Sequence, residues 1–460
     1  MTTFEVVRGM RVALPGGIAP AAIHIRDGRI TKVTAYDDVP EGMSASAILE
    51  AGRRYVFPGL VDTHVHINDP GRTAWEGFAS ATRAAAAGGV TTLVDMPLNS
   101  IPATVTPEAV EAKLHVMDGK AHVDVGLCGG LVPSNASKVG ELRREGVLAF
   151  KCFLAESGVA EFAHVEAEPL LAGLRGLAKV DAPLFVHAEL PGPLEEAARL
   201  QGNVSPSDAR KYATYLASRP KSAEEAAIDL VLSSLRASGA RAHIVHLSAA
   251  SALPILAKAR DEGIPLSAET CPHYLTLAAE DVPDGATAFK CAPPIRERKN
   301  QDELWQGLRD GLIRQIVTDH SPATMDLKCS DSGDFMRAWG GISSLQIGFA
   351  VVYDAARRRG VPMADVVRWM SAEPARLAGL EGKKGSIAVG CDADFALYDD
   401  DEVWSVSAGA LEHKNPVCAY EGKSLQGRVV LTILRGEVIF DHSRPAPFSA
   451  GASGTWLRAR

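Results

Sequence analysis

The chain has 460 residues, of which 46% are hydrophobic and 23% charged, as in an ordinary globular protein and unlike a disordered or collagen-like chain. Its 48 lysines and arginines against 56 aspartates and glutamates give a net charge of -8, without the basic clustering of a dedicated nucleic-acid binder and with no electrostatic reason to bind an anionic membrane. At roughly 150 residues per domain, the length predicts two or three domains, or one large barrel with additions.

The cysteines and the N-terminal residues predict the cellular compartment of the protein. The seven cysteines are scattered singly without a Cys-x-x-Cys pair, which is typical of reduced thiols. The first residues lack the charged and apolar regions of a signal peptide, and no stretch approaches the roughly 20 apolar residues of a membrane helix. We therefore expect a cytoplasmic protein that binds neither membrane nor nucleic acid.

Both ends of the chain have the texture of short β-strands. Residues 4–7 and 23–25 are β-like runs separated by glycine and proline turns, and Arg26-Asp27-Gly28-Arg29 is a hairpin signal. The far end repeats this style at residues 395–398, 429–434 and 435–440, and the last ten residues resemble a loose tail. We predict that the two ends, residues 1–56 and 386–460, combine into one small β domain.

The middle of the chain alternates short apolar runs with alanine-rich helical stretches, such as residues 78–87 and 223–235. Alternation of this kind indicates βα units and a parallel sheet. We predict a central (β/α) barrel over residues 57–385.

Successive apolar runs of this region end in residues that bind metals or transfer protons. These residues are His64, His66, Asp95, Lys151, His187, His246 and Asp319. Because the chemistry of a barrel collects at the carboxyl ends of its strands, we expect these side chains to converge on one mouth.

The histidines and the aspartate favour a metal site when they are taken together. His64 and His66 lie two apart in an extended run, so both imidazoles face the same way and can hold one ion. His-x-His alone also occurs by chance, and a lone histidine such as His187 or His246 is often a hydrogen-bonded core residue. A carboxylate buried at a strand end, as predicted for Asp319, costs several kcal/mol unless it is paired or metal-bound.

Lys151 lies within the apolar run 148–154, where burial disfavours an ammonium and lowers its pKa. It can be an ion-paired or snorkelling lysine. Alternatively, its neutral amine can react with carbon dioxide to give a carbamate, an anionic ligand with two oxygens that can bridge two metal ions.

The segment from Phe57 to His66, together with the strand lysine, the two later histidines and the aspartate, resembles the cyclic amidase branch of the amidohydrolase superfamily, which includes dihydroorotases, hydantoinases and allantoinases. The resemblance covers nearly the whole chain. It implies an α/β fold, a (β/α)8 TIM-type barrel with a small β-sandwich domain built from both chain ends. It also implies a homotetramer.

The resemblance further implies a binuclear metal centre with two divalent ions per subunit. Zinc suits the ligands, with cobalt, manganese or iron(II) as alternatives. The implied ligands are His64, His66, Lys151 as N6-carboxylysine, His187, His246 and Asp319. Asp319 is also the implied catalytic base, which passes a proton from water to the leaving nitrogen.

Two positions separate the members of this branch. Dihydroorotases carry a substrate-binding arginine where this chain has Asn68, and Arg72 is a possible substitute. Hydantoinases usually carry a tyrosine where this chain has Glu156. Both differences argue against these two activities, which stay as alternatives beside a catalytically inactive scaffold relative; such scaffolds normally lose metal ligands, and none is lost here.

The segments 68–77, 95–102, 335–342 and 413–417 resemble the allantoinases. This resemblance implies hydrolysis of allantoin to allantoate in purine degradation. The neutral substrate suits a pocket of amides, hydroxyls and backbone groups, for which we select Asn99, Ser321, Trp339 and Gly340. Each has a structural alternative, since Asn99 can serve a turn, Ser321 can cap a helix and Trp339 can be a packing residue.

Overall fold

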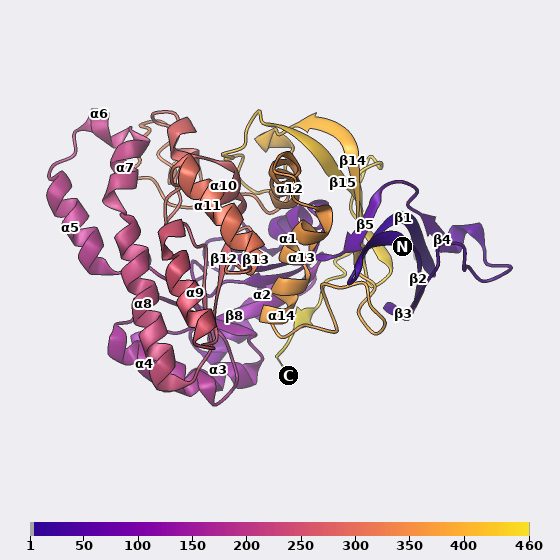
Figure 1. Cartoon of the computed structure of the whole chain (residues 1–460), viewed down its shortest axis with the longest axis horizontal. Coiled ribbons are helices and arrows are strands. Elements are labelled where there is room, and N and C mark those ends of the chain that lie inside the picture. The colour runs from indigo at the N-terminus through magenta and orange to yellow at the C-terminus, as the bar shows by residue number, and fades with distance from the viewer. Residues whose placement is uncertain (1–3, 460) are drawn as a thin grey trace.

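A computed structural model of the protein describes residues 4–459 and contains two sheets (Figure 1). One sheet has the strand order β16-β15-β14-β5-β1-β2-β3, with β4 beside β1. The other has the order β13-β12-β11-β10-β9-β8-β7-β6, with β17 beside β8. In Figure 1 the second sheet and its helices form the larger body at left, and the first sheet lies at right.

The smaller sheet joins both ends of the chain, as predicted. Its strands are β1 (Val6–Leu14), β2 (Gly17–Arg26), β3 (Arg29–Thr34), β4 (Ile48–Glu50), β5 (Tyr55–Pro58), β14 (Phe395–Ser405), β15 (Ser424–Leu434) and β16 (Glu437–Asp441). The N-terminal and C-terminal strands meet where β5 pairs antiparallel with β14. The predicted hairpin is confirmed, because Asp27 and Gly28 both have positive φ (51° and 72°), as the tight turn between β2 and β3 requires.

Eight strands of the larger sheet run parallel in one continuous order and close into the predicted barrel, with β17 as a ninth strand beside β8. The eight strands are β6 (Leu60–Val65), β7 (Val90–Asp95), β8 (Asp124–Gly130), β9 (Ala149–Phe153), β10 (Leu184–His187), β11 (Ala242–Ile244), β12 (Leu266–Thr270) and β13 (Gln315–Ile316). A bridge between Val65 and His320 connects the first strand to the segment after the last. The residues of β6 to β11 are buried, as strands covered on both faces must be.

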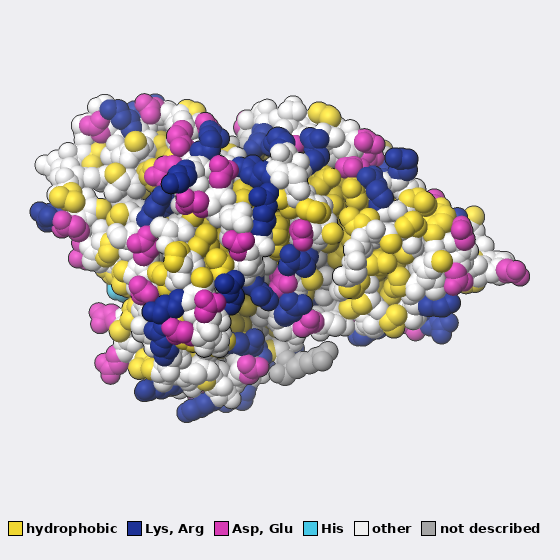
Figure 2. All heavy atoms as spheres, viewed as in Figure 1, with side chains coloured by type: hydrophobic (Ala, Val, Ile, Leu, Met, Phe, Trp, Pro, Cys, Tyr) yellow, Lys and Arg dark blue, Asp and Glu magenta, His cyan; other side chains and the backbone are white. Residues whose placement is uncertain are grey.

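Helices cover the outside of the barrel. They are α1 (Phe78–Ala87), α2 (Pro107–Met117), α3 (Val139–Glu145), α4 (Ala167–Ala178), α5 (Pro191–Gln201), α6 (Pro206–Ala209), α7 (Tyr212–Ser218), α8 (Lys221–Ser238), α9 (Leu253–Asp261), α10 (Pro272–Thr276), α11 (Arg298–Arg309), α12 (Gly348–Arg358), α13 (Met363–Met370) and α14 (Ala372–Leu377). In α8 the residues Ala227, Val231 and Leu235 recur at helical spacing and are buried, so one face of the helix packs inward. The other face is polar, and Figure 2 shows acidic and basic side chains mixed over this side of the molecule.

Single 3-10 turns complete the connections: η1 (Ala45–Ala47), η2 (Pro133–Asn135), η3 (Ala250–Ala252), η4 (Ala279–Asp281), η5 (Thr287–Phe289) and η6 (Ala408–Ala410). Among residues 4–459, no helix has the length and continuous hydrophobicity needed to cross a bilayer.

The prediction of a loose C-terminal tail is wrong. Strand β17 (Trp456–Leu457) pairs in parallel with Val125 and Gly126 of β8, and Leu457 is buried. Ala459 extends the contact, since its N–H donates to the carbonyl oxygen of Gly146 at 2.9 Å. Two residues are too few to produce an alternating pattern in the sequence. They nevertheless pair with the part of β8 that precedes its pairing with β9.

Candidate active site

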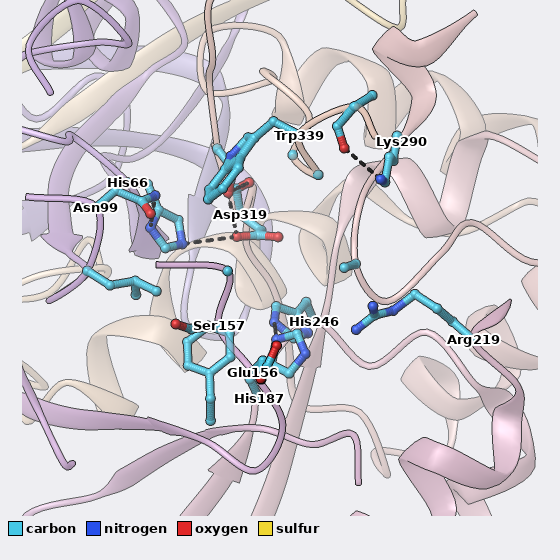
Figure 3. Close-up of a pocket in the computed structure, with 18 of the residues that line it drawn as sticks. His66, Asn99, Glu156, Ser157, His187, Arg219, His246, Lys290, Asp319 and Trp339 are labelled. Atoms are coloured by element: carbon cyan, nitrogen blue, oxygen red, sulfur yellow. Dashed lines mark hydrogen bonds and ion pairs between the residues drawn. The ribbon is translucent and has the colours of Figure 1, made fainter. Parts of the chain in front are cut away.

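The carboxyl ends of the barrel strands surround a cavity of about 340 Å³ (Figure 3). Five of the six residues expected to bind metal line this cavity, namely His66, Lys151, His187, His246 and Asp319. His64 is fully buried beneath them. Asp95, the other strand-end residue, lies away from the cavity, because its carboxylate is paired with the ammonium of buried Lys113 and accepts from the backbone N–H of Ile67.

His64, His66 and Asp319 come together from the first strand and the last. The Oδ1 atom of Asp319 lies 3.2 Å from Nε2 of His64 and 3.6 Å from Nε2 of His66. Asp319 has a φ of 45° and His246 a φ of 40°, conformations that are unusual for residues other than glycine and that often mark functional sites. Burial would raise the pKa of the Asp319 carboxyl, but the facing imidazoles outweigh burial and hold that pKa well below its ordinary value.

Lys151 reaches into the same group from β9. Its Nζ atom lies 2.6 Å from Nε2 of His64, and the residue is only 1% exposed. Burial lowers the pKa of Lys151, although Asp319 and Glu269 attract the charged form. The neutral amine form is therefore more favoured for Lys151 than for a solvent-exposed lysine.

His187 and His246 form the other half of the group. Nδ1 of His187 lies 3.0 Å from Nε2 of His246, and Nδ1 of His246 is buried without a hydrogen-bond partner among residues 4–459. Burial lowers the pKa of both imidazoles, and it lowers the pKa of His66 to about 3. Neutral imidazoles with free lone pairs are the form in which histidine binds metals.

Two glutamates behind these histidines were missed from the sequence. Oε1 of Glu269 lies 2.6 Å from Nδ1 of His64, and Oε2 of Glu189 lies 2.8 Å from Nε2 of His187. Arg219 in turn donates from Nε to Glu189 at 3.0 Å. A carboxylate behind an imidazole fixes the ring so that its other nitrogen faces the site, which is the arrangement common around bound metals.

A detectable signal existed for both glutamates. Glu269 is a charge inside the strand 266–270, and Glu189 follows His187 by two residues. Neither signal says which imidazole the carboxylate contacts.

The side chains of the mouth suit divalent metal ions. Nitrogens of His64 and His66 and a carboxylate oxygen of Asp319 all lie within 4.8 Å of one another. The unpartnered nitrogen of His246 is a further buried donor that water or an ion must satisfy. Imidazole and carboxylate donors together are typical of zinc, cobalt, manganese or iron sites.

All four residues selected for the substrate pocket line the cavity. Asn99 places Nδ2 3.4 Å from Nδ1 of His66, and its Oδ1 is buried without a partner among the described residues. The hydroxyl of Ser321 donates to Asp319, at 2.9 Å to the carbonyl oxygen and 3.0 Å to Oδ1. Trp339 packs its ring edge-on against Trp75, with 4.9 Å between centroids.

The residues that distinguish the members of the cyclic amidase branch lie in or near the cavity. The side-chain amide of Asn68 is buried without a partner among the described residues. Arg72 donates from Nη1 to the carbonyl oxygen of Asn99 at 2.8 Å and is paired with Glu161, so it ties two loops together and does not line the cavity. Glu156 does line the cavity.

The cavity also has a cationic side that was missed from the sequence. Arg219 and Lys290 both line it, across from His66 and Asn99 in Figure 3. No pattern around either residue singles it out, because both lie in connections between regular elements.

Comparisons with known proteins agree with this geometry. The profile of the Amidohydrolase family matches residues 55–439. An allantoinase of Streptomyces avermitilis is 51% identical over 94% of this chain and 95% of its own length, and an allantoinase of Arabidopsis thaliana is 41% identical over 97% and 90%. Among solved structures, the L-hydantoinase (dihydropyrimidinase) of Arthrobacter aurescens superposes with a TM-score of 0.92 at 27% identity, covering 99% of this chain and 100% of that one.

Proposed function

Since the chain belongs to the amidohydrolase family, we propose that it acts as an allantoinase, opening the hydantoin ring of allantoin with water to give allantoate. The observation that carries this proposal is the identity to allantoinases over nearly the full length of both chains. Asn68 supports it, because a dihydroorotate carboxylate would lack the guanidinium that fits it at this position.

We propose that two divalent ions, zinc in the first place, are held by His64, His66, Lys151, His187, His246 and Asp319. When bound, such ions polarise an amide carbonyl and lower the pKa of water so that hydroxide is available near neutral pH. The chain contributes imidazoles for this purpose: Glu269 orients His64 and Glu189 orients His187 from behind, and burial keeps His66 neutral.

We propose that Lys151 carries a carbamate. Its neutral amine nitrogen would form a bond to the carbon of carbon dioxide and release one proton, leaving an anion with two oxygens. Burial and the lowered pKa of Lys151 support this step, because only the neutral amine has the lone pair that reacts.

Asp319 is the proposed catalytic base and acid. Its carboxylate, held ionised by the surrounding imidazoles, would accept a proton from the attacking water and deliver it to the ring nitrogen as the amide bond breaks. Ser321 donates to the carboxylate of Asp319 and so helps to fix its orientation.

Asn99, Ser321, Trp339 and Gly340 are the proposed substrate contacts. They supply amide, hydroxyl, aromatic and backbone groups around the cavity, a set that suits a neutral ring with a ureido arm. The unpartnered Oδ1 of Asn99 supports this role, since a substrate N–H would satisfy it.

We further propose that residues 57–385 form the catalytic domain and that residues 1–56 with 386–460 form the small β domain. The separate strand orders of the two sheets support this division. A cytoplasmic location is supported by seven cysteines that form no disulfide. The proposed homotetramer rests on the resemblance to cyclic amidases alone.

The decisive experiment compares three substrates with one purified, metal-loaded preparation. Allantoin should be opened faster than hydantoin and dihydroorotate, as measured by kcat/KM. Rapid opening of hydantoin or dihydroorotate with allantoin left intact would overturn the proposal. Metal analysis and intact mass address the inactive scaffold, which would contain neither transition metal nor the carbamate on Lys151.

A further inference from the structure

Two buried lysines lie at one wall of the cavity, and one of them, Lys290, itself lines the cavity. The Nζ atom of Lys290 donates to the carbonyl oxygens of Met336 at 3.2 Å and Ala338 at 2.6 Å, and it lies 4.9 Å from the centroid of the Tyr215 ring. The Nζ atom of Lys328 donates to the carbonyl oxygens of Lys290, at 3.1 Å, and Gly341. Within residues 4–459, neither ammonium forms an ion pair with a carboxylate. Both ammonium groups are therefore held by backbone carbonyls, with the Tyr215 ring beside that of Lys290.

A buried cation without a counter-charge is costly. Its desolvation amounts to several kcal/mol, and carbonyl dipoles recover less of this than a carboxylate would. In agreement, burial lowers the pKa of Lys328 to about 7 and that of Lys290 to about 8. Burial of these two ammonium groups without a carboxylate therefore opposes folding, so a gain in stability alone does not explain the pair.

Three of the four carbonyls that the lysines hold, those of Met336, Ala338 and Gly341, belong to one loop, residues 336–341, all six of which line the cavity. The loop is also fixed by its own backbone, because Gly341 donates to the carbonyl oxygen of Lys290 at 2.8 Å and Trp339 donates to that of Leu327 at 2.7 Å. Gly341 packs so closely that a Cβ atom there would lie 2.2 Å from the carbonyl oxygen of Ser321.

The lysines also decide which groups this wall offers to a ligand. Three of its carbonyl oxygens, those of Met336, Ala338 and Gly341, are occupied by ammonium groups. The wall therefore offers fewer acceptors to a substrate than a free loop would, and the side chain of Lys290 lines the same cavity. Lys290 and Arg219, which line this side of the cavity, supply N–H donors, so this side favours a ligand group that presents a carbonyl oxygen, as a ureido arm does.

We infer that Lys290 and Lys328 are positioning residues that hold the loop 336–341 as the wall selecting a substrate with a ureido arm. This inference rests on the proposed function, because the ureido group distinguishes allantoin from plain hydantoin. The ring amide must lie near Asp319, and Lys290 lies on the side of the cavity across from His66 (Figure 3). An arm that extends from the ring in that direction meets the wall held by the lysines.

Lys290→Met and Lys328→Met test the inference, because methionine keeps an unbranched side chain, one atom shorter than lysine, and removes the charge and the donors. Each should lower kcat/KM for allantoin by about 10- to 100-fold, mainly through KM, since misplaced binding groups have effects of this size. The value for hydantoin should change by less than about threefold. If hydantoin turns over too slowly, its inhibition constant against allantoin gives the same comparison. Lys299→Met is the matched control, because that side chain is 90% exposed, and it should change neither value.

Hydrogen exchange of the loop gives a readout that needs no substrate. The amides of Trp339 and Gly341 should exchange faster in both methionine variants and at the wild-type rate in Lys299→Met. Lys328→Gln keeps an uncharged N–H donor group, so its exchange rates should lie between those of wild type and Lys328→Met. Unchanged exchange, or an equal loss of activity toward allantoin and hydantoin, would overturn the inference. Failure of the wild-type protein to open allantoin would instead refute the proposed function, and the exchange result would still stand.

Discussion

Two buried lysines at opposite ends of the barrel have opposite surroundings. Lys151, at the carboxyl end of β9, faces an imidazole nitrogen 2.6 Å away. Lys384 lies below the barrel, where its Nζ atom is 2.6 Å from Asp124, 2.7 Å from Asp394 and 3.0 Å from Asp392. The two are 1% and 2% exposed, so burial does not distinguish them.

The partners determine the charge of each lysine. Burial alone would lower the pKa of Lys384, but its three carboxylates outweigh burial and raise that pKa above the ordinary value. At Lys151 burial prevails and the pKa is lowered. Lys384 is fully paired with carboxylates, so it and the three aspartates form a structural ion network. Lys151 is not fully paired, which leaves an amine at the mouth of the barrel that can react. The amino ends of barrel strands thus serve stability and the carboxyl ends serve chemistry.

Lys151→Ala should have the largest effect, because it removes the proposed bridging ligand. We expect kcat for allantoin to fall by about 10⁴-fold together with loss of bound metal, as when a member of a catalytic group is deleted. Short carboxylic acids in solution should restore part of both, since they supply the missing anion. Metal content and kcat are measured on the same sample, and full retention of both would refute the carbamate.

Asp319→Asn should reduce kcat by about 10³-fold, because an amide cannot accept the proton from water. The fold should persist, since the amide keeps the shape of the carboxylate and can still accept from Ser321. Circular dichroism and the unfolding midpoint serve as controls. Near wild-type turnover in a properly folded variant would exclude Asp319 as the base.

Lys384→Met should affect stability and spare the chemistry. It leaves Asp124, Asp392 and Asp394 buried around an apolar side chain, and breaking a buried ion network in this way costs about 3–5 kcal/mol in the free energy of unfolding. Thermal unfolding measures this loss, and kcat of the folded fraction should stay within about twofold of wild type. Lys383→Met is the control, because Lys383 is half-buried and forms no ion pair among the described residues. A variant as stable as that control would show that Arg435, which also pairs with Asp124, is sufficient.

The regular parts of the molecule could be predicted from the sequence. The helix expected at 78–87 is α1, and the strand-end rule placed His66, Lys151 and Asp319 around one cavity although up to 253 positions, from 66 to 319, separate them. This works because parallel strands bring their carboxyl ends to the same edge regardless of the chain between them.

The contacts behind and beside these residues could not be predicted. Glu269 reaches His64 across 205 positions, a pairing fixed by barrel closure and side-chain rotamers that no local pattern encodes. Lys290 and Lys328 lie in connections, where only the folded loop shows that their partners are backbone carbonyls. Asp95 follows the strand-end rule yet pairs with Lys113, so the rule selects candidates and the neighbours decide their role.

The smallest predicted effect is a difference in the pH dependence of stability between Lys328 and Lys384. The pKa of Lys328 is lowered to about 7 in the folded protein, whereas in the unfolded chain it returns to roughly 10.4. Between these values the unfolded state holds a proton that the folded state lacks, so this site makes stability rise with pH, by up to about 1.4 kcal/mol per unit. Below about pH 7 both states are protonated, and the full penalty of the buried charge applies.

Lys328→Met removes this titration. Its stability relative to wild type should therefore be greatest at pH 7 and should decline toward pH 9, as measured by unfolding midpoints at one scan rate in metal-saturated buffer. The raised pKa of Lys384 has the opposite consequence: both states hold the proton up to the unfolded value, so the deficit of Lys384→Met should be constant from pH 7 to 9. Parallel pH curves for wild type and Lys328→Met would mean that carbonyl dipoles keep Lys328 charged as effectively as carboxylates keep Lys384.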